Sequence, residues 1–376
     1  MDSKKANLFS PLTTTSFSFP NRIAMAALTR MRCDYNTCVP NELHVKYYSE
    51  RARKCAFVLT ECTSISKLGN NFPGACGIYT DEQVEGWKKV IDAVHKEGGK
   101  IFLQIWHCGR AGHSNDGGLP VAPSPIPLKG QAHTSKGKAD YEVPHELTIE
   151  EIKEIVEQFR KGAENAQKAG FDGLELHAAN GYLVDEFLRD GTNKRTDIYG
   201  GSIENRSRFC LEVTDALISV YGKDKVGLKL CPLGRYQDMF DSDPKALYFY
   251  LLKQLSDRNV LFIELAECDA VMFGKEIDDQ IREFAKEGTL ASIFRKYFNG
   301  IYVTNCGWTK ETGNQIIEEG HADMVTFGRL FLANPDLVER FQNNWELNEG
   351  NVKTWFTPGA EGYTDYPFYE KNNGNI

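Results

Sequence analysis

Short apolar runs alternate with longer amphipathic stretches along most of the chain. Eight apolar runs have the length expected of strands buried on both faces, and they lie at 22–26, 57–61, 100–106, 173–177, 226–230, 262–265, 300–304 and 324–327. Stretches with helical periodicity follow them at 41–52, 81–97, 148–169, 202–221, 244–258, 278–288, 309–319 and 335–343. The pattern therefore predicts eight strands, each followed by a helix.

The stretch 148–169 illustrates how the pattern predicts a helix. Its apolar residues recur every three or four positions, as on a helix that packs one face against a sheet. Thr148 opens the stretch and Glu151 follows three residues later, which is the signature of a capping box. Gly170 follows the last periodic residue and predicts the end of the helix.

Alternating strands and helices of this kind predict a (β/α)8 TIM barrel, formed by a single domain that spans residues 1–376. The alternative is a doubly wound open sheet, which usually carries a G-x-G-x-x-G motif after its first strand. No such motif follows residue 26. The stretch 109–144, after the third strand, shows neither periodicity. We predict that it is a long loop, serving as a lid or specificity element on the active-site side of the barrel.

Composition narrows the classes of function. The formal net charge is −8, and Lys and Arg are interleaved with Asp and Glu, which argues against nucleic-acid or anionic-membrane partners. The first residues lack the apolar core of a secretory signal, and no apolar run approaches the length that spans a bilayer. We therefore expect a cytoplasmic protein, monomeric or homodimeric, that acts on a small molecule.

The cysteines predict neither a disulfide framework nor a metal centre. The chain has 10 cysteines, and they are scattered without a C-x-x-C pair or the spacing of a zinc or iron–sulfur site. In a chain of this length we expect reduced, mostly buried thiols and no metal ligands among them.

Small and cationic residues follow the last two predicted strands, where a barrel often holds a phosphate group. Cys306 and Gly307 come after the seventh strand, and Gly328 and Arg329 after the eighth. Backbone N–H groups beside a small residue and a planar guanidinium suit an anion. The alternative is that both glycines form ordinary turns and that Arg329 is a surface cation.

Three polar residues follow the fourth predicted strand in quick succession: His177, Asn180 and Tyr182. Two N–H donors that converge on one oxygen polarise a carbonyl group, and each such donor contributes roughly 3–4 kcal/mol. A tyrosine stays protonated at neutral pH and can deliver a proton. A single histidine at a strand end is usually structural, but the combination of three predicts a catalytic site.

Further polar residues complete a ring at the barrel mouth. Gln104 lies on the third predicted strand, Lys229 on the fifth, and Thr29 just beyond the first. A glutamine both donates and accepts hydrogen bonds, which suits the edge of an imide, and a fixed cation could stabilise an anion formed in the reaction. The alternative for each is an isolated polar residue at the mouth.

At these positions the chain resembles the Old Yellow Enzyme family of flavin ene-reductases, nearly from end to end. The most specific block is 177–183, with the sequence HAANGYL. Further matching blocks lie at 21–23, 27–32, 60–63, 104–107, 193–197, 199–206, 327–329, 334–337 and 362–367.

The resemblance implies FMN on the barrel axis. It implies that the cofactor is held by Ala27, Leu28, Thr29, Cys62, Gln104, Lys229, Cys306, Gly307, Gly328 and Arg329, the last four at its phosphate. It further implies that His177 and Asn180 bind a substrate carbonyl and that Tyr182 protonates the alpha carbon. NADPH or NADH would reduce the flavin, which would then pass hydride to the beta carbon of an enone, quinone or nitro compound in ping-pong turnover.

The chain also departs from the family. Lys229 stands where the family usually has an arginine near the flavin, so the charge is kept and the bidentate fork is lost. Phe72 and Phe356 replace two tyrosines that are common in the substrate pocket, which also contains Trp106. Flavin affinity and substrate range are therefore not transferred from the family.

Two alternatives belong to other classes of protein. A flavin-free barrel lyase or isomerase of a phosphorylated metabolite would use the same phosphate corner, with Lys229 as the candidate for a Schiff base. A non-catalytic flavin-binding barrel would bind FMN and turn over no substrate. The colour of the purified protein distinguishes the first of these alternatives from a flavoenzyme.

Overall fold

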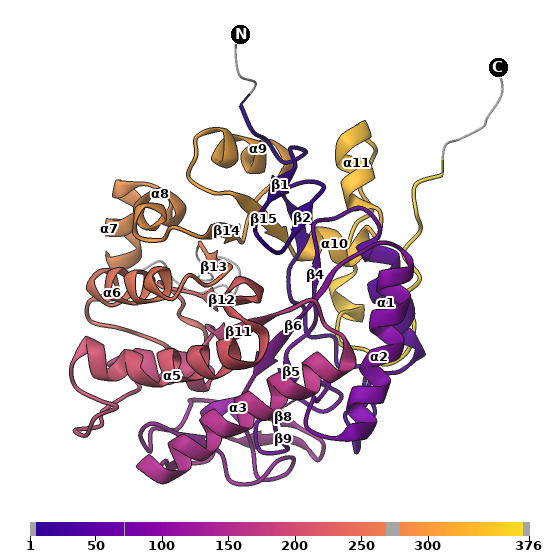
Figure 1. Cartoon of the computed structure of the whole chain (residues 1–376). Coiled ribbons are helices and arrows are strands. Elements are labelled where there is room, and N and C mark those ends of the chain that lie inside the picture. The colour runs from indigo at the N-terminus through magenta and orange to yellow at the C-terminus, as the bar shows by residue number, and fades with distance from the viewer. Residues whose placement is uncertain (1–4, 71, 268–278, 371–376) are drawn as a thin grey trace, which may run out of the picture.

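The computed structural model describes residues 5–70, 72–267 and 279–370. Its main sheet contains eight parallel strands in a closed ring (Figure 1). In the order of the ring these strands are β3 (Ile23–Met25), β4 (Val58–Leu59), β6 (Ile101–Trp106), β11 (Gly173–Ala178), β12 (Val226–Leu230), β13 (Phe262–Ala266), β14 (Ile301–Asn305) and β15 (Met324–Phe327). β15 pairs with β3, which closes the barrel. The predicted (β/α)8 barrel is confirmed.

Helices surround the outside of the barrel (Figure 1). The larger ones are α1 (Glu42–Ala52), α2 (Asp81–Lys96), α3 (Ile149–Ala169), α5 (Ile203–Tyr221), α6 (Pro244–Asp257), α7 (Asp279–Glu287), α9 (Lys310–Glu318) and α11 (Leu337–Asn343). These are the eight helices predicted from periodicity, and residue 278 of the sixth prediction lies outside the described residues. Short helices α4 (Leu183–Leu188), α8 (Leu290–Phe294) and α10 (Arg329–Ala333) were not predicted. Among the described helices, none is long and apolar enough to cross a membrane.

Helix α3 begins and ends where its sequence predicts. The Thr148 side chain accepts a hydrogen bond from the Glu151 backbone, and the Glu151 side chain accepts one from the Thr148 backbone in return. Gly170 ends the helix with φ 100°, a left-handed conformation that glycine adopts without strain. The buried face of α3 carries Ile152, Ile155 and Phe159. Capping and periodicity thus fix this helix against the barrel.

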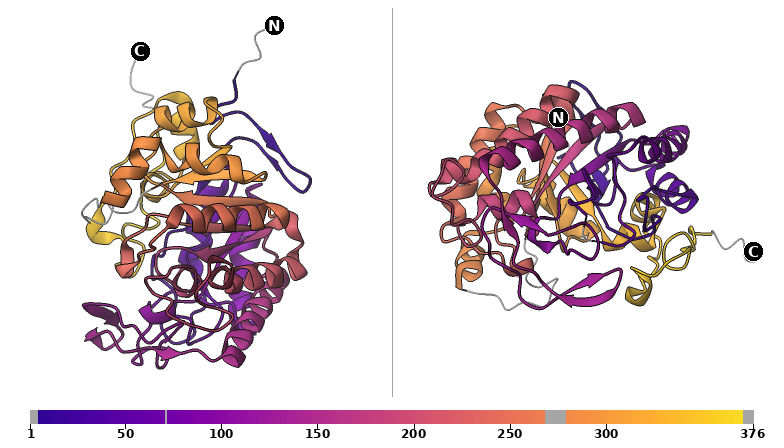
Figure 2. Two further views of the ribbon diagram at one scale, coloured as in Figure 1. Left: turned by 90° about the vertical axis from the view of Figure 1, so that its left-hand side faces the viewer. Right: turned by 90° about the horizontal axis from the view of Figure 1, so that it is seen from below.

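An N-terminal hairpin closes the end of the barrel where the strands begin. Strands β1 (Leu12–Thr13) and β2 (Ser18–Phe19) pair in antiparallel fashion, and the sequence did not predict them. The Phe17 ring lies 5.3 Å from that of Phe102, and the Phe19 ring lies 5.7 Å from that of Phe57. In the left view of Figure 2 this indigo hairpin and the purple hairpin β8–β9 lie on opposite sides of the barrel.

The segment 109–144 contains more regular structure than the sequence predicts. It forms strand β7 (Val121–Ala122), which pairs with β10 (His145–Glu146), and an antiparallel hairpin of β8 (Gln131–Thr134) and β9 (Gly137–Asp140). The strands are short and rich in polar residues, so they show neither an apolar run nor a clear alternation. The remaining short elements are β5 (Thr63–Ser64) and 3₁₀ turns at Gly109–Ala111, Lys223–Lys225, Tyr236–Asp238, Arg295–Tyr297 and Val352–Thr354.

The expectation of reduced thiols is wrong for two cysteines. Cys33 and Cys76 form a disulfide across 43 residues of sequence, with their Cα atoms 5.7 Å apart. Free thiols are found at Cys38, Cys55, Cys62, Cys108, Cys210, Cys231 and Cys306, and all but the last are buried. The fold of the chain brings the two cysteines together. Their spacing in the sequence does not predict the disulfide.

Candidate active site

Four neighbouring strands place polar side chains at the same end of the barrel. Gln104 on β6 is in register with Glu175 on β11. Further toward the strand ends, His177 on β11 is in register with Lys229 on β12, and Lys229 with Glu264 on β13. All five side chains are buried. Parallel strands in this register therefore bring an amide, two carboxyls, an ammonium and an imidazole together.

These side chains bind one another. The Gln104 amide donates a hydrogen bond of 2.6 Å to one Glu175 oxygen, and its carbonyl oxygen accepts one of 3.2 Å from the Cys62 thiol. The Lys229 ammonium forms an ion pair with Glu264. One oxygen of Glu175 and one of Glu264 have no hydrogen-bond partner among the described residues. Buried polar atoms of this kind usually have a partner, so they indicate room for a ligand or for ordered water.

Burial and neighbouring charges shift the pKa values of the ionisable groups in this network. Burial disfavours the Lys229 ammonium, but the neighbouring Glu264 carboxylate outweighs that effect and raises the lysine pKa. Burial, and then the nearby charge of Glu264, raises the pKa of Glu175 well above its usual value. Glu175 is therefore a neutral acid at pH values where an exposed glutamate is ionised, and Lys229 with Glu264 forms the charged pair.

The raised pKa of Glu175 predicts a pH dependence of stability. Between its unfolded pKa, near 4.5, and the higher folded value, the folded protein binds this proton and the unfolded chain does not. The free energy of unfolding should therefore fall as pH rises from 5 to 8, with a contribution of up to about 1.4 kcal/mol per pH unit. We expect Glu175→Gln to remove this contribution, as measured by denaturant unfolding at both pH values.

The control for this experiment is the exposed Glu150, whose replacement by Gln should keep the wild-type dependence. An unchanged slope in Glu175→Gln would show that this carboxyl is ionised in the folded protein.

His177 faces the site as a neutral imidazole. It is 3% exposed, and burial, followed by the charge of Lys229, lowers its pKa well below the usual value. Its buried Nδ1 has no hydrogen-bond partner among the residues that the structure describes. A neutral ring carries one N–H group, on either nitrogen, and this group can donate a hydrogen bond to a ligand oxygen.

Tyr182 lies at the start of α4 in an aromatic environment. Its ring stands edge-on to His177, with centroids 5.0 Å apart, and edge-on to Trp106 at 5.2 Å. Phe72 stacks on Trp106 with centroids 6.0 Å apart. Burial, and then the neighbouring Cys62, raises the phenol pKa well above 10, so Tyr182 keeps its proton at neutral pH. The predicted pocket residues Phe72 and Trp106 thus surround the predicted proton donor.

A buried ion pair fixes the segment that carries Asn180 and Tyr182. Arg189 donates a 2.8 Å hydrogen bond to Asp185, and Asp185 in turn accepts one of 3.0 Å from the Gly181 backbone. Asn180 is half-buried and has a left-handed φ of 61°, which asparagine tolerates better than most residues. A side chain on Gly181 would meet Met239 at 2.8 Å, so the turn requires glycine there.

The predicted phosphate corner is open. Cys306 and Gly307 both have left-handed φ angles, 76° and 81°, directly after β14. No atom lies within 4 Å of the position that a Gly307 Cβ would take, whereas a Cβ on Gly328 would be 3.3 Å from Leu28. Arg329 begins α10, is exposed, and stacks over Trp355 with its guanidinium 5.4 Å from the ring centroid. Space, small residues and a cation therefore meet at this corner.

The other predicted residues have different environments. Ala27, Leu28 and Thr29 follow β3 and are half-buried, and the Thr29 hydroxyl is in hydrogen-bonding contact with the Cys62 thiol. Phe356 is 60% exposed, so most of its side chain faces solvent in this structure. Leu128 and Tyr141, from the segment 109–144, pack in the same cluster as Trp106 and Tyr182.

Two residues of the network were missed from sequence. Glu175 and Glu264 each interrupt an otherwise apolar strand, flanked by Leu174 and Leu176 and by Ile263 and Leu265. A glutamate within a doubly buried strand is the signal that could have identified them, because a buried carboxyl requires a partner.

Comparison with known proteins decides the family. A family model described as NADH:flavin oxidoreductase / NADH oxidase matches residues 7–348. An old yellow enzyme homologue from Zymomonas mobilis superposes with a TM-score of 0.90 at 41% identity, covering 96% of this chain and 99% of that one. The chain belongs to the Old Yellow Enzyme family.

Other members of the Old Yellow Enzyme family match over similar lengths. Morphinone reductase superposes with a TM-score of 0.90 at 38% identity, and the match covers all of both chains. 12-Oxophytodienoate reductase 7 of Oryza sativa subsp. japonica is 40% identical over 97% of this chain and 95% of that protein. The protein is therefore an FMN-dependent NAD(P)H oxidoreductase, and family membership argues against the flavin-free lyase or isomerase.

The residues present fit FMN. The open space at Gly307 beside the Arg329 cation suits a phosphate. The half-buried Thr29 and the polar network of Gln104 and Lys229 suit the polar edge of a flavin ring.

Proposed function

We propose that the protein reduces a carbon–carbon double bond conjugated to a carbonyl group, using NADPH as the source of electrons. When bound, FMN supplies two-electron redox chemistry, accepting electrons from a reduced nicotinamide and delivering them to the second substrate. The substrate class is an electron-poor alkene such as an enone, and a quinone meets the same electronic requirement.

The observation that carries this proposal is a set of three neutral hydrogen-bond donors at the end of β11. The neutral His177 ring and the Asn180 amide can donate to one carbonyl oxygen, which draws electron density away from the conjugated double bond. Tyr182, which keeps its proton, can then protonate the carbon alpha to that carbonyl. The three residues together provide polarisation and a proton, which are what reduction of an enone requires from the protein.

We assign the cofactor to the residues of the polar ring and the phosphate corner. Cys306, Gly307, Gly328 and Arg329 would hold its phosphate, while Thr29, Cys62 and Gln104 would contact the ring, beside the backbone of Ala27 and Leu28. Lys229 would provide a cation next to the ring. Its ion pair with Glu264 partly neutralises that charge. Morphinone reductase has been crystallised with tetrahydroNAD, which supports a nicotinamide as the electron source here.

The resemblance to the family implies a more apolar pocket, because Phe72 and Phe356 stand where tyrosines are common. Phe72 lies beside Trp106 without a hydroxyl group. We infer that the substrate contacts this apolar wall through carbon atoms and is held in place by the carbonyl contacts alone. Phe356 would join the wall once a substrate occupies the mouth.

A spectroscopic experiment tests the proposed function. The purified protein should be yellow, should bleach when NADPH is added without oxygen, and should regain its colour when cyclohexenone is added. A protein that binds FMN and bleaches, but is not reoxidised by any enone or quinone, would contradict the ene-reductase proposal and favour a non-catalytic flavin-binding barrel. A colourless protein that borohydride traps on a substrate would favour a lyase.

A further inference from the structure

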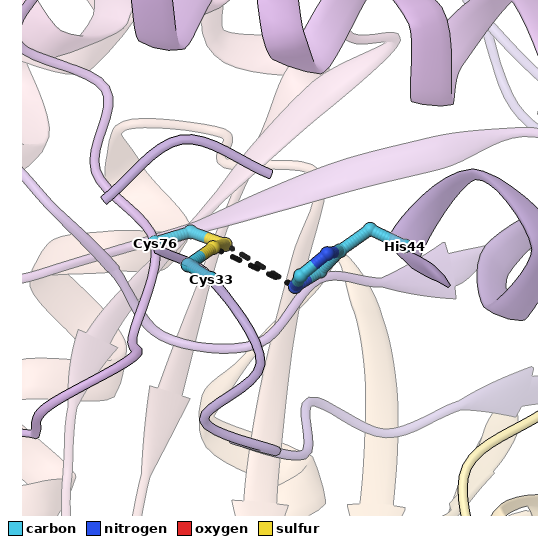
Figure 3. A group of neighbouring side chains, drawn as sticks. All are labelled: Cys33, His44 and Cys76. Carbon is cyan, nitrogen blue, oxygen red and sulfur yellow. Dashed lines mark hydrogen bonds between the residues drawn. A yellow bond between two sulfur atoms is a disulfide. The ribbon is translucent and has the colours of Figure 1, made fainter. Parts of the chain in front are cut away.

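The Cys33–Cys76 disulfide lies against a histidine in the protein interior (Figure 3). The imidazole of His44 points at the two sulfur atoms, and its Nε2 is 3.5 Å from each of them. The same Nε2 is 3.4 Å from a carboxylate oxygen of Glu61. None of the four side chains is more than 4% exposed. Two sulfurs, an imidazole nitrogen and a carboxylate therefore meet in a dry environment, contributed by four separate segments.

The Glu61 carboxylate is incompletely satisfied. Its Oε2 accepts a 3.4 Å hydrogen bond from the Arg30 backbone. Its Oε1, which faces His44, has no hydrogen-bond partner among the described residues. A buried carboxylate oxygen in this condition is costly, and a positive charge between it and the imidazole would satisfy it. His44 Nε2 lies 3.4 Å from this oxygen, so either a proton on that nitrogen or a metal ion bound to it would satisfy the carboxylate.

The distances agree with the edges of a tetrahedral zinc site. With Zn–S bonds of about 2.3 Å and Zn–N and Zn–O bonds of about 2.0–2.2 Å, tetrahedral angles separate N from S by about 3.5 Å and N from O by about 3.4 Å. These are the separations of His44 Nε2 from the two sulfurs and from Glu61. Among these four residues, only Cys33, His44 and Cys76 have ligand atoms that all lie within 4.8 Å of one another. The two sulfurs must therefore move apart, to about 3.8 Å, and the Glu61 carboxylate must move toward them, because tetrahedral angles separate S from O by about 3.6 Å.

We propose that Cys33, His44, Glu61 and Cys76 form a zinc-class metal site when the disulfide is reduced. An external thiol pair supplies two electrons and two protons, breaks the S–S bond and leaves as its own disulfide. The metal ion then replaces the two thiol protons, which pass to solvent, and binds two thiolates, one imidazole nitrogen and one carboxylate oxygen. In the reverse direction, an external disulfide accepts two electrons from the thiolates and two protons from solvent and leaves as two thiols, while the Cys33–Cys76 bond forms again and the metal ion is released. The structure described here contains the disulfide and therefore represents the oxidised state.

The surroundings of His44 allow it to act as a ligand. Its Nδ1 lies 3.1 Å from both the backbone N and the side-chain oxygen of Asn41. The ring can thus accept a hydrogen bond at Nδ1 in the metal-free state, or donate one to the Asn41 oxygen when Nε2 binds the metal. A second hydrogen bond that fixes the ring in this way is typical of metal-bound histidines.

The proposed site borders the residues assigned to the flavin. Cys33 follows the loop that carries Thr29, and Glu61 directly precedes Cys62, whose thiol hydrogen-bonds to Gln104. The segments of Cys33 and Cys76 are joined by a covalent bond in the oxidised state. In the reduced state the metal ion would join both of them to Glu61. The inference goes beyond the proposed function and does not depend on it.

Cobalt binding tests the proposal on the intact protein. The protein is reduced anaerobically with a phosphine, separated from the reductant, and titrated with Co²⁺, with untreated protein in parallel. We expect the reduced protein to take up one Co²⁺ with visible d–d absorption at wavelengths beyond those of the flavin, which Zn²⁺ then abolishes. The oxidised protein should take up none. Absence of uptake by the reduced protein, or equal uptake by both forms, would overturn the proposal.

Two variants locate the site. Cys76→Ser should lose Co²⁺ uptake under reducing conditions, whereas Cys210→Ser, which removes another buried thiol, should keep it. Circular dichroism and flavin content report whether each variant is folded. Uptake that persists in folded Cys76→Ser would place the metal elsewhere. If Cys76→Ser does not fold, the comparison of oxidised with reduced wild-type protein decides alone.

Discussion

Replacing Tyr182 with phenylalanine is expected to slow reoxidation by an enone about 10²–10⁴-fold, because a positioned general acid contributes a factor of that size. The substitution removes one hydroxyl and leaves the ring in contact with His177 and Trp106. Reduction by NADPH should proceed at the wild-type rate, since that step requires no proton from Tyr182. Stopped-flow spectroscopy of the two half-reactions separates these effects.

Tyr141→Phe provides the matched control, because Tyr141 packs against the same cluster and loses the same atom. Its two half-reactions should keep their wild-type rates. An unchanged rate of enone reduction in Tyr182→Phe would remove this residue from the proposed role, and slowing of both half-reactions would indicate a structural effect instead.

Replacing Lys229 with methionine should cost about 3–5 kcal/mol of unfolding free energy, because it leaves the Glu264 carboxylate buried without its partner. FMN retention should also weaken, since the cation next to the flavin ring is lost. Denaturant unfolding with and without saturating FMN, together with the flavin-to-protein ratio, measures both effects.

The double variant Lys229→Met with Glu264→Leu distinguishes charge from packing. Removing both ions should recover most of the lost stability, because an apolar pair can replace a buried ion pair at little cost. FMN retention should stay weak if the cation contributes directly to binding. Lys223→Met, at an exposed lysine before β12, should behave as wild type. A stable single variant with normal flavin content would show that Lys229 has neither role.

The barrel could be predicted closely from sequence because its determinants are local. The strands β12 (Val226–Leu230) and β15 (Met324–Phe327) have the predicted bounds, since an apolar run between polar turns defines a buried strand. Helix α3 could be predicted to the residue from its caps. Each of these elements can be predicted from a window of fewer than about twenty-five consecutive residues.

The features that sequence did not predict depend on contacts between distant segments. The hairpin of β1 and β2 is too short to show a period, and it is stabilised by barrel residues such as Phe57 and Phe102. The disulfide joins Cys33 and Cys76, which lie on either side of α1 in the sequence, so it depends on the path of the chain between them. The predicted site residues His177, Tyr182 and Trp106 do come together, whereas the roles of Arg329 and Phe356 stay predictions.

The phenylalanines of the N-terminal hairpin close the end of the barrel where the strands begin, so the barrel is open only at the opposite end. Phe17 packs against Phe102 and Phe19 packs against Phe57. These rings block access to the barrel from this end. The electron donor and the electron acceptor would then enter from the same end of the barrel. If both substrates occupy the same pocket, they must bind in turn.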